Sequence, residues 1–465
     1  MQRLNSIDKP AGLSPSPEQT GAVCSTEAGA LLPTVKPAAA GRKAALSSWL
    51  TGEESGPLLV NSAWNVAAVI IPGVLTIPAM GIMGRKLGVE MFGLFTLAFG
   101  VLGYASILDV GLSRAVIRSV SLYRGDERKV RVIVGTASCV VLAFGMFGAA
   151  ALWIAAGPLT HLLKVAPASE PELVRSFQWL SLGIPCYLLA LIWFSYLEGK
   201  ERFAELSALK SITYSLTAVL PVIAVLIHNS LESAVAGLVL TRFISLGVAY
   251  ARYYDGRYRL WCFDRHELRD LIQFGGWIVV SNITSPIMVY FDRFVLASIS
   301  GAQTIAFYTA PADGITRVSV LPGALARSLF PRLNNKSVDA NQQARLASRI
   351  MLVGSVSIGI PIFVFARQIM TLWMGPQYGG TASIALRILI VGFVFNALAL
   401  VPFAAIQARG DSRTTAFVHL AEVVPYLALL FFLIYRFSIP GAALAWTARM
   451  FADFVVLSVL SRRGK

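Results

Sequence analysis

Long apolar segments, separated by short polar connections, fill the chain from residue 58 to its C-terminus. Each is long enough to cross about 30 Å of hydrocarbon at about 1.5 Å of helix per residue. Because no water inside a bilayer satisfies backbone N–H and C=O groups, each segment is predicted to be helical. The predicted fold is an all-α polytopic membrane protein with about 12 transmembrane helices, at residues 58–83, 90–111, 131–156, 177–197, 208–228, 232–252, 271–297, 303–325, 347–367, 381–405, 415–436 and 439–460.

Lys and Arg gather in alternate connections between these spans. The connections after the second, fourth, sixth, eighth and tenth spans are basic, most clearly at residues 114–131, 252–269 and 327–349, whereas the opposite set holds few cations. By the positive-inside rule the basic side faces the cytoplasm. Both termini are therefore predicted to be cytoplasmic, in agreement with an even number of spans.

Composition divides the chain into a tail and two halves. Residues 1–55 are rich in Pro, Ala, Ser and Gly and lack a persistent helical stripe, which predicts a disordered cytoplasmic tail. Either a dispensable extension or a regulatory tail fits this composition. The longest polar connection, residues 253–270, is predicted to be cytoplasmic and to separate an N-terminal six-helix lobe at 56–252 from a C-terminal six-helix lobe at 271–465.

A faint internal repeat supports this division. The stretch from Gly88 to Thr96, after the first span, has its counterpart in the stretch from Gly301 to Thr309, after the seventh span. Two halves related by internal repetition are common among transporters, which bind their substrate between the halves.

Composition also limits the function. The 465 residues are 56% hydrophobic and 14% charged, with a mean hydropathy of +0.66, which lies outside the range of soluble domains. A net charge of +15 is better explained by topology and anionic lipid than by a nucleic acid partner. The cysteines show no paired spacing, which argues against a disulfide framework or a metal site, and no cofactor is predicted: Cys24, Cys139, Cys186 and Cys262.

The sequence contains no motif of a soluble enzyme. It lacks a P-loop, which argues against ATP hydrolysis within the chain. The predicted external connections are short, whereas membrane-embedded glycosyltransferases need sizeable polar loops. The chain is therefore predicted to move a substrate rather than to modify one covalently, without catalytic residues.

Charged residues inside the predicted spans mark the candidate substrate pathway. The first group, Asp109, Arg114 and Arg118, lies near the cytoplasmic end of the second span. Arg114 and Arg118 are four residues apart and share a helix face, so they either anchor the helix at lipid phosphates or contact substrate.

The second group lies in the seventh and eighth spans. Asp292 and Arg293 are adjacent, hence about 100° apart on a helix, so at least one should face a cavity or another helix. Asp313 and Arg317 have the spacing of a local ion pair. A structural ion pair between helices and a substrate contact are both open for this group. Arg242, in the sixth span, is interpreted as a member of a structural pair.

The third group lies in the last three spans. Arg449 and Asp453 again have the spacing of a local pair, and Arg387 lies in the tenth span. Glu422 precedes Pro425, where a helix can open and expose carbonyls, so Glu422 is a candidate for a titrating or cation-binding carboxylate. Packing through ion pairs is the alternative.

Several short stretches resemble bacterial polysaccharide flippases. The stretch 61–65, Asn-Ser-Ala-Trp-Asn, and residues 85–95 are similar to the opening of these proteins, and Asp-Val-Gly-Leu-Ser-Arg-Ala at 109–115 is similar to the close of their second helix. Residues 282–294 and 301–308 resemble the start of their second half. On this resemblance, which covers about residues 58–461, the chain is identified as a member of the O-antigen and exopolysaccharide translocases of the multidrug/oligosaccharidyl-lipid/polysaccharide exporter superfamily.

The resemblance implies two six-helix lobes around a cationic central cavity in the bacterial inner membrane. It implies transport of a polyprenyl-diphosphate-linked oligosaccharide to the outer leaflet, ion-coupled alternating access, and a polysaccharide polymerase and glycosyltransferases as partners beside the lipid bilayer. Arginine offers paired donors to phosphate oxygens. The predicted headgroup contacts are Arg293, Arg317, Arg387 and Arg114, and the predicted charge-tuning or ion-coupling residues are Asp292, Asp313, Glu422 and Asp109.

Three other functions are alternatives to this one. The first span has no charge before Arg85, which argues against the related lipid II flippases. A multidrug or cation antiporter of the same superfamily would favour an acidic, aromatic cavity. In this sequence the charged residues without a predicted partner are mainly arginines. A non-transporting membrane subunit of a polysaccharide assembly system is the third, although the large external loop typical of polymerases is missing.

Overall fold

The computed structural model describes residues 55–253, 262–333, 340–409 and 411–463. The predicted tail, apart from Ser55, and Cys24 lie outside the described residues, and so does most of the predicted connection at 253–270. Residues Pro57–Lys465 form one compact unit, so the division into two lobes stays a prediction.

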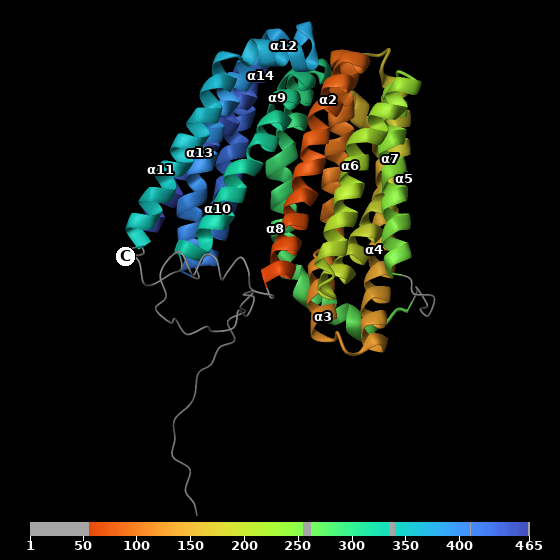
Figure 1. Cartoon of the computed structure of the whole chain (residues 1–465). Coiled ribbons are helices and arrows are strands. Elements are labelled where there is room, and N and C mark those ends of the chain that lie inside the picture. Colours follow the sequence, from red (N-terminus) through yellow and green to blue (C-terminus); the bar gives the residue numbers. More distant parts are fainter. Residues whose placement is uncertain (1–54, 254–261, 334–339, 410, 464–465) are drawn as a thin grey trace, which may run out of the picture. The chain divides into compact units, whose positions relative to one another are not determined.

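The described residues fold into helices and turns, which confirms the all-α prediction (Figure 1). Figure 1 shows the helices side by side, with α3 near the lower end and α12 at the upper end. The first part of the chain forms α2 (Ser55–Ala105), the 3-10 helix η1 (Ser106–Asp109), α3 (Leu112–Leu122), α4 (Glu127–Leu162), α5 (Glu170–Gly199), α6 (Phe203–Ile227) and α7 (Leu231–Tyr253). The second part forms α8 (Arg265–Ser300), η2 (Ala302–Thr304), α9 (Ile305–Val318), α10 (Val320–Leu333), α11 (Ala340–Val364), α12 (Ala366–Met374), η3 (Pro376–Gly379), α13 (Thr381–Ala408) and α14 (Ser412–Arg463).

Most of the predicted spans lie within these helices, although the helices differ from the prediction in where they begin, end and join. Helix α2 contains the first span and most of the second, and it breaks at Gly88, where φ is 78°. Helix α14 contains the last two spans and breaks at Ser438, where φ is 53°. The predicted eighth span is divided between α9 and α10. In the described residues eight helical segments are long and apolar enough to cross a membrane, so the chain is a multi-pass membrane protein and the count of 12 stays a prediction.

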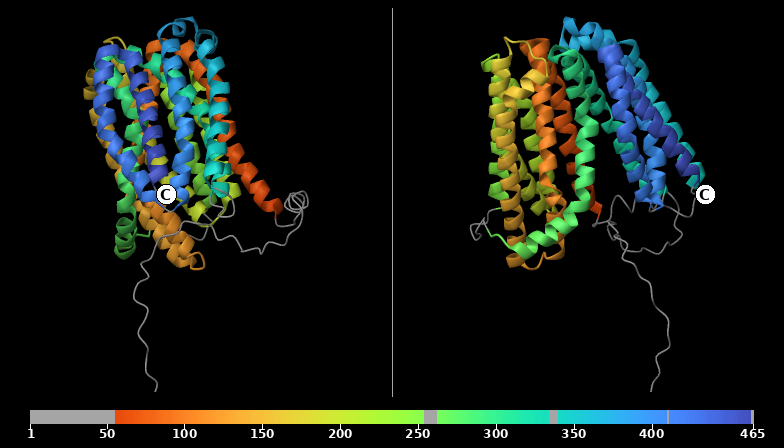
Figure 2. Two further views of the ribbon diagram at one scale, coloured as in Figure 1. Left: turned by 90° about the vertical axis from the view of Figure 1, so that its left-hand side faces the viewer. Right: turned by 180° about the vertical axis from the view of Figure 1, so that it is seen from behind.

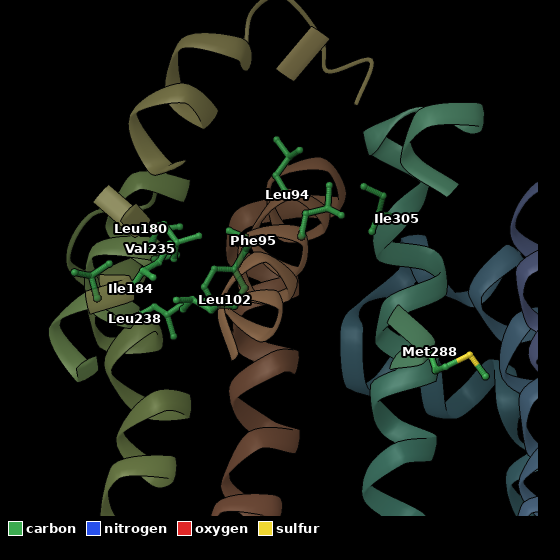
Figure 3. Packing of buried hydrophobic residues seen from close by; sticks show 14 of the residues in the cluster. Leu94, Phe95, Leu102, Leu180, Ile184, Val235, Leu238, Met288 and Ile305 are labelled. Carbon is green, nitrogen blue, oxygen red and sulfur yellow. The ribbon is translucent and has the colours of Figure 1, made fainter. Parts of the chain in front are cut away.

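The helices pack in two sets. Helix α5 packs on α4 and α7, helix α6 packs on α7, and α13 packs against α9, α11 and α14. Helix α8 contacts both sets, because it begins beside α3 and α4 and ends beside α9 and α14, as the right-hand view of Figure 2 shows. Figure 3 shows part of the apolar core, where Leu102 of α2, Leu180 of α5 and Leu238 of α7 are buried.

The start of α8 is held tightly to α3 and α4. The Arg118 guanidinium lies 4.4 Å from the centre of the Phe274 ring, and Lys129 Nζ lies 3.7 Å from Glu267 Oε1. A Cβ atom on Gly135 of α4 would lie 2.8 Å from the carbonyl oxygen of Cys262, so only glycine allows this approach.

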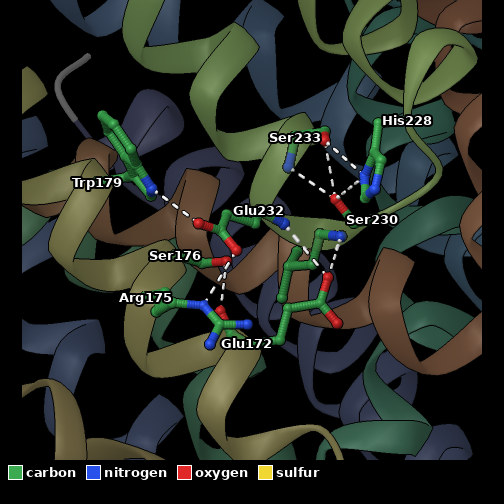
Figure 4. Close-up of polar contacts among 9 residues, drawn as sticks. Glu172, Arg175, Ser176, Trp179, His228, Ser230, Glu232 and Ser233 are labelled. Carbon is green, nitrogen blue, oxygen red and sulfur yellow. Dashed lines mark hydrogen bonds and ion pairs between the residues drawn. The ribbon is translucent and has the colours of Figure 1, made fainter.

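A polar cluster joins α5 to the start of α7 (Figure 4). Glu172 Oε1 accepts the backbone N–H of Leu231 at 2.6 Å, which satisfies a free donor at the start of α7. Glu232 accepts from Arg175 Nε at 3.1 Å and from Trp179 Nε1 at 3.0 Å. Arg175, one of the arginines outside the basic connections, therefore has a structural partner.

The two copies of the sequence repeat meet in space. Gly88 and Gly301, which begin the copies, both have positive φ, of 78° and 89°. Thr96 and Thr309, which end them, are buried, and their Oγ1 atoms lie 3.3 Å apart. The repeat therefore has a structural counterpart in which α2 and α9 contact each other directly.

Further contacts join α2 to α12 at the upper end in Figure 1. Trp373 Nε1 donates to the carbonyl oxygen of Ile77 at 2.6 Å, and the Arg85 guanidinium donates to the carbonyl oxygen of Leu372. The Trp373 side chain fits against Gly81 of α2 and Gly314 of α9, where a Cβ atom would lie 2.9 Å and 3.2 Å from its indole ring.

Candidate functional site

A cavity of about 710 Å³ lies between the two sets of helices. Its walls come from α2, α5, α6 and α7 on one side and from α8, α9, α13 and α14 on the other. The described residues that line it include four arginines and two aspartates, a formal excess of positive charge: Arg242, Arg293, Arg317, Arg449, Asp292 and Asp313. This volume lies within the range of small-molecule binding sites, about 300–1,000 Å³.

Asp292 and Arg293 both line the cavity, and each has its own partner. Arg293 donates to Asp313 Oδ1 at 2.5 Å, and Asp292 Oδ2 accepts from the Tyr308 hydroxyl at 2.5 Å. Asp292 and Arg293 are only 6% and 5% exposed, so these partners offset much of the cost of burying charge. Asp313 therefore pairs with Arg293 of another helix rather than with Arg317, its neighbour in the sequence.

Arg242 and Arg317 line the cavity without a carboxylate partner in the described part of the chain. Arg242 comes from α7 and is 9% exposed, and its guanidinium lies 5.1 Å from the centre of the Tyr187 ring. Arg317 comes from α9 and is partly buried. The Nε atoms of both make no hydrogen bond to described residues. The sequence interpretation of Arg242 as half of an ion pair has no counterpart among these residues.

Arg449 also lines the cavity, and its partner is Glu422 rather than Asp453. Arg449 Nε lies 3.7 Å from Glu422 Oε2, and the two side chains are largely buried, at 15% and 14% exposed. His419 Nδ1 lies 3.8 Å from Glu422 and 3.9 Å from Asp453. The sequence reading missed His419, although its position three residues before Glu422 could have indicated contact on one helix face.

The other predicted site residues lie away from the cavity. Arg387 of α13 is partly exposed, and its Nε donates to the carbonyl oxygen of Phe363 of α11 at 3.2 Å. Arg114 is exposed on α3. Asp109 is buried and accepts from the backbone N–H and the hydroxyl of Ser113, at 3.2 Å and 2.7 Å, so it caps the start of α3.

Aromatic side chains form much of the remaining wall. Tyr187, Phe194 and Tyr214 come from α5 and α6, and Tyr290 and Trp446 come from α8 and α14. Such rings offer flat, largely apolar surfaces next to the arginines. Abundant aromatic residues along the sequence gave no signal for which of them face one cavity.

Comparisons with known proteins agree with this architecture. The family model described as polysaccharide biosynthesis protein matches residues 58–337. The "Putative O-antigen transporter" of Shigella flexneri is 37% identical over 409 residues, which cover 87% of this chain and 98% of the relative. The "Succinoglycan biosynthesis transport protein ExoT" of Rhizobium meliloti (strain 1021) is 24% identical over 328 residues, which cover 68% of this chain and 63% of the relative.

Solved structures share the fold at low sequence identity. The lipid II flippase MurJ in an inward closed conformation has a TM-score of 0.73 at 12% identity, over 86% of this chain and 87% of that one. An inward-facing multidrug resistance MATE family transporter of the MOP superfamily has a TM-score of 0.70 at 17% identity, over 86% and 97%. The family model and the Shigella flexneri relative confirm the predicted polysaccharide translocase family and the prediction of a transporter rather than an enzyme, and the solved structures show the fold.

Proposed function

Because the chain belongs to the polysaccharide biosynthesis protein family, we propose that it flips a polyprenyl-diphosphate-linked oligosaccharide across the bacterial inner membrane. The product of this step supplies the outer leaflet for surface polysaccharide assembly, either O-antigen or exopolysaccharide. The relatives' names support transport in polysaccharide biosynthesis, and the charges that line the cavity support an anionic, lipid-linked substrate.

The observation that carries the proposal is a pair of cavity arginines that have no carboxylate partner among the described residues. Arg242 and Arg317 reach the cavity from opposite sets of helices. Burying a guanidinium without a counter-charge is costly, so an anion that occupies the cavity gains from both. A diphosphate headgroup suits them because a guanidinium donates two parallel hydrogen bonds to phosphate oxygens.

The proposed headgroup contacts therefore differ from those expected from the sequence. Arg317 remains and Arg242 joins it, while Arg293 supports the site through Asp313. Arg387 and Arg114 are left out, because neither lines the cavity. The aromatic wall at Tyr187 offers a surface for the apolar faces of sugar rings.

The proposal includes an orientation and a transport cycle. The end of the bundle that holds α3 carries the basic connections and is assigned to the cytoplasm, with both termini, by the positive-inside rule. The Thr96–Thr309 contact and the Trp373 contacts with α2 then close the opposite end. This arrangement supports an inward-facing state of an ion-coupled alternating-access cycle.

Substitution in a producing cell tests the proposed headgroup site. Arg242→Ala and Arg317→Ala should each abolish or strongly reduce surface polysaccharide, because each removes a donor to the headgroup. Arg387→Ala is the matched control, since this arginine lies outside the cavity, and it should leave polysaccharide near the wild-type level. Membrane levels of all three variants are measured by immunoblot. Normal polysaccharide from both cavity variants would reject the site.

The two alternative functions have their own readouts. A drug-cation antiporter would need a free carboxylate in the cavity, whereas Asp292 and Asp313 are both bonded to partners. Raised drug resistance on overexpression, with unchanged polysaccharide in the arginine variants, would favour that function. A non-transporting subunit would fail to move lipid in vesicles that contain this chain alone.

A further inference from the structure

Four ionisable side chains of α14 come together beside the cavity, although two of them precede the break in this helix and two follow it. His419 and Glu422 precede the break at Ser438, and Arg449 and Asp453 follow it. Because the chain reverses at this break, ligand atoms of His419, Glu422 and Asp453 all lie within 4.8 Å of one another. We call these four residues the α14 cluster.

The α14 cluster holds two carboxylates and one permanent cation. Asp453 is 8% exposed, and its Oδ1 makes no hydrogen bond to described residues. Both carboxylate oxygens of Glu422 are buried and likewise lack hydrogen bonds within the described residues. Two carboxylates this close and this buried cannot both stay ionised beside a single guanidinium without a large penalty. One further positive charge, or one proton, is needed.

The surroundings supply no other cation for this purpose within the described residues. Tyr426 lies under Arg449, with its ring centre 5.3 Å from the guanidinium carbon. Helix α13 contributes the Phe403 ring, 5.8 Å from the His419 ring. Helix α8 contributes Asp292 and Arg293, whose own partners are Tyr308 and Asp313.

Arg449 belongs to both the α14 cluster and the cavity. Its Nε lies 3.7 Å from Glu422, and the same side chain lines the cavity wall. We propose that the α14 cluster is a proton-exchange site that Arg449 couples to the cavity. An anion in the cavity draws Arg449 away from Glu422, and the carboxylates that lose their cation take up one proton, shared with His419. This inference rests on the proposed anionic headgroup.

A proton fits the α14 cluster better than a metal ion does. His419 is the residue type that titrates between about pH 5 and 8 without a large perturbation. A metal ion bound to Glu422 would be repelled by the Arg449 guanidinium, which lies against the same carboxylate oxygen as His419 does. A proton on one of the carboxylates brings no second cation against the Arg449 guanidinium.

Calorimetry counts the exchanged protons directly. Farnesyl diphosphate, a short polyprenyl diphosphate, is titrated into the purified full-length protein in two buffers of different ionisation enthalpy. Wild type should take up about one proton more per bound probe than His419→Gln does, and its affinity should rise about tenfold per unit fall in pH. Subtracting the variant removes the probe's own protonation.

Two further variants keep the result interpretable. Asp453→Asn should also lower the proton count, because the carboxylate pair is lost. His161→Gln is the matched control, since His161 also lies near a carboxylate, 3.4 Å from Glu170, but its side chain is 74% exposed and does not line the cavity. The number of protons that His161→Gln takes up per bound probe should equal that of wild type.

Each outcome decides between distinct claims. Equal proton counts for wild type, His419→Gln and Asp453→Asn, with the probe still bound, would overturn the proton-exchange site and leave the headgroup site standing. Binding that depends on sodium at constant pH, without proton uptake, would replace the proton by a metal ion and also overturn the inference. Failure of wild type to bind the probe would overturn both the headgroup site and the coupling.

Discussion

The hydroxyl groups of Thr96 and Thr309 lie 3.3 Å apart, at matching positions of the two copies of the sequence repeat. Both residues are buried, and Thr96 also lines the cavity. Residues that match in a two-fold repeat and touch each other must lie close to its axis. In the proposed alternating-access cycle, this contact is where we expect the two sets of helices to separate when the cavity opens on that side.

Cross-linking at this contact should stop transport. We expect Thr96→Cys with Thr309→Cys to form a disulfide under oxidation, because adjacent hydroxyls place their Cβ atoms within reach of one. The oxidised double variant should lose transport and regain it after reduction, whereas each single variant should respond to neither treatment. Full transport by the fully oxidised double variant would show that this contact never opens.

The Trp373 indole should favour the closed form of the same end. Trp373→Phe keeps the ring between Gly81 and Gly314 but removes the donor to Ile77. Losing one hydrogen bond costs about 1 kcal/mol, or about a fivefold shift towards opening. The measurement is labelling of a cysteine introduced at Thr316, a cavity residue, by an impermeant maleimide added from outside.

Trp179→Phe is the matched control for this labelling experiment. It also removes an indole hydrogen bond, to Glu232, but at the join between α5 and α7. Its labelling should equal that of the parent. Equal labelling of the two variants would mean that the Trp373 bond has no part in closure.

The cavity arginines should differ in their effect on stability. Arg293→Ala leaves Asp313 without its partner, and breaking a buried ion pair typically costs about 3 kcal/mol or more. Arg317→Ala breaks no ion pair within the described residues, so it should leave the unfolding temperature near that of wild type while impairing transport. Thermal unfolding in detergent makes the comparison, and an equal loss of stability in both variants would contradict the two assigned roles.

The close approach of α4 to the start of α8 should make Gly135 sensitive to substitution. Gly135→Ala places a Cβ atom 2.8 Å from the carbonyl oxygen of Cys262, and overpacking of this kind costs about 1–3 kcal/mol. Gly157→Ala, in the same helix, meets no atom within 4 Å and should be neutral or stabilising, because alanine favours helix. Greater stability of Gly135→Ala than of Gly157→Ala would disprove the close contact.

Most of the helices could be predicted from the sequence because bilayer thickness sets the length of an apolar span, whereas the division of the eighth span between α9 and α10 could not. The repeat could also be predicted, since Gly88 and Gly301 share a backbone conformation that favours glycine. The ion-pair partners of the charged residues could not be predicted from the sequence. Spacing along one helix suggested pairing of Asp313 with Arg317, whereas packing of α8 on α9 brings Arg293 to Asp313 instead.

Arg242 shows the same limit. An isolated arginine in a predicted span indicates a cavity or an ion pair equally well, and only the arrangement of α5 and α7 shows Tyr187 beside it rather than a carboxylate. His419 and Asp453 lie in the two predicted spans on either side of the break at Ser438, and spacing along one helix gives no signal for a contact between two spans.

The central claim is that Arg242 and Arg317 together bind a diphosphate headgroup that the chain carries across the membrane. The most direct test uses vesicles containing only the purified protein and a fluorescent polyprenyl-diphosphate lipid, with a quencher added outside to follow movement between leaflets. We predict rapid movement with wild type and with Arg387→Ala, and a rate close to that of protein-free vesicles with Arg242→Ala and Arg317→Ala. Movement at the wild-type rate in both cavity variants would contradict the account.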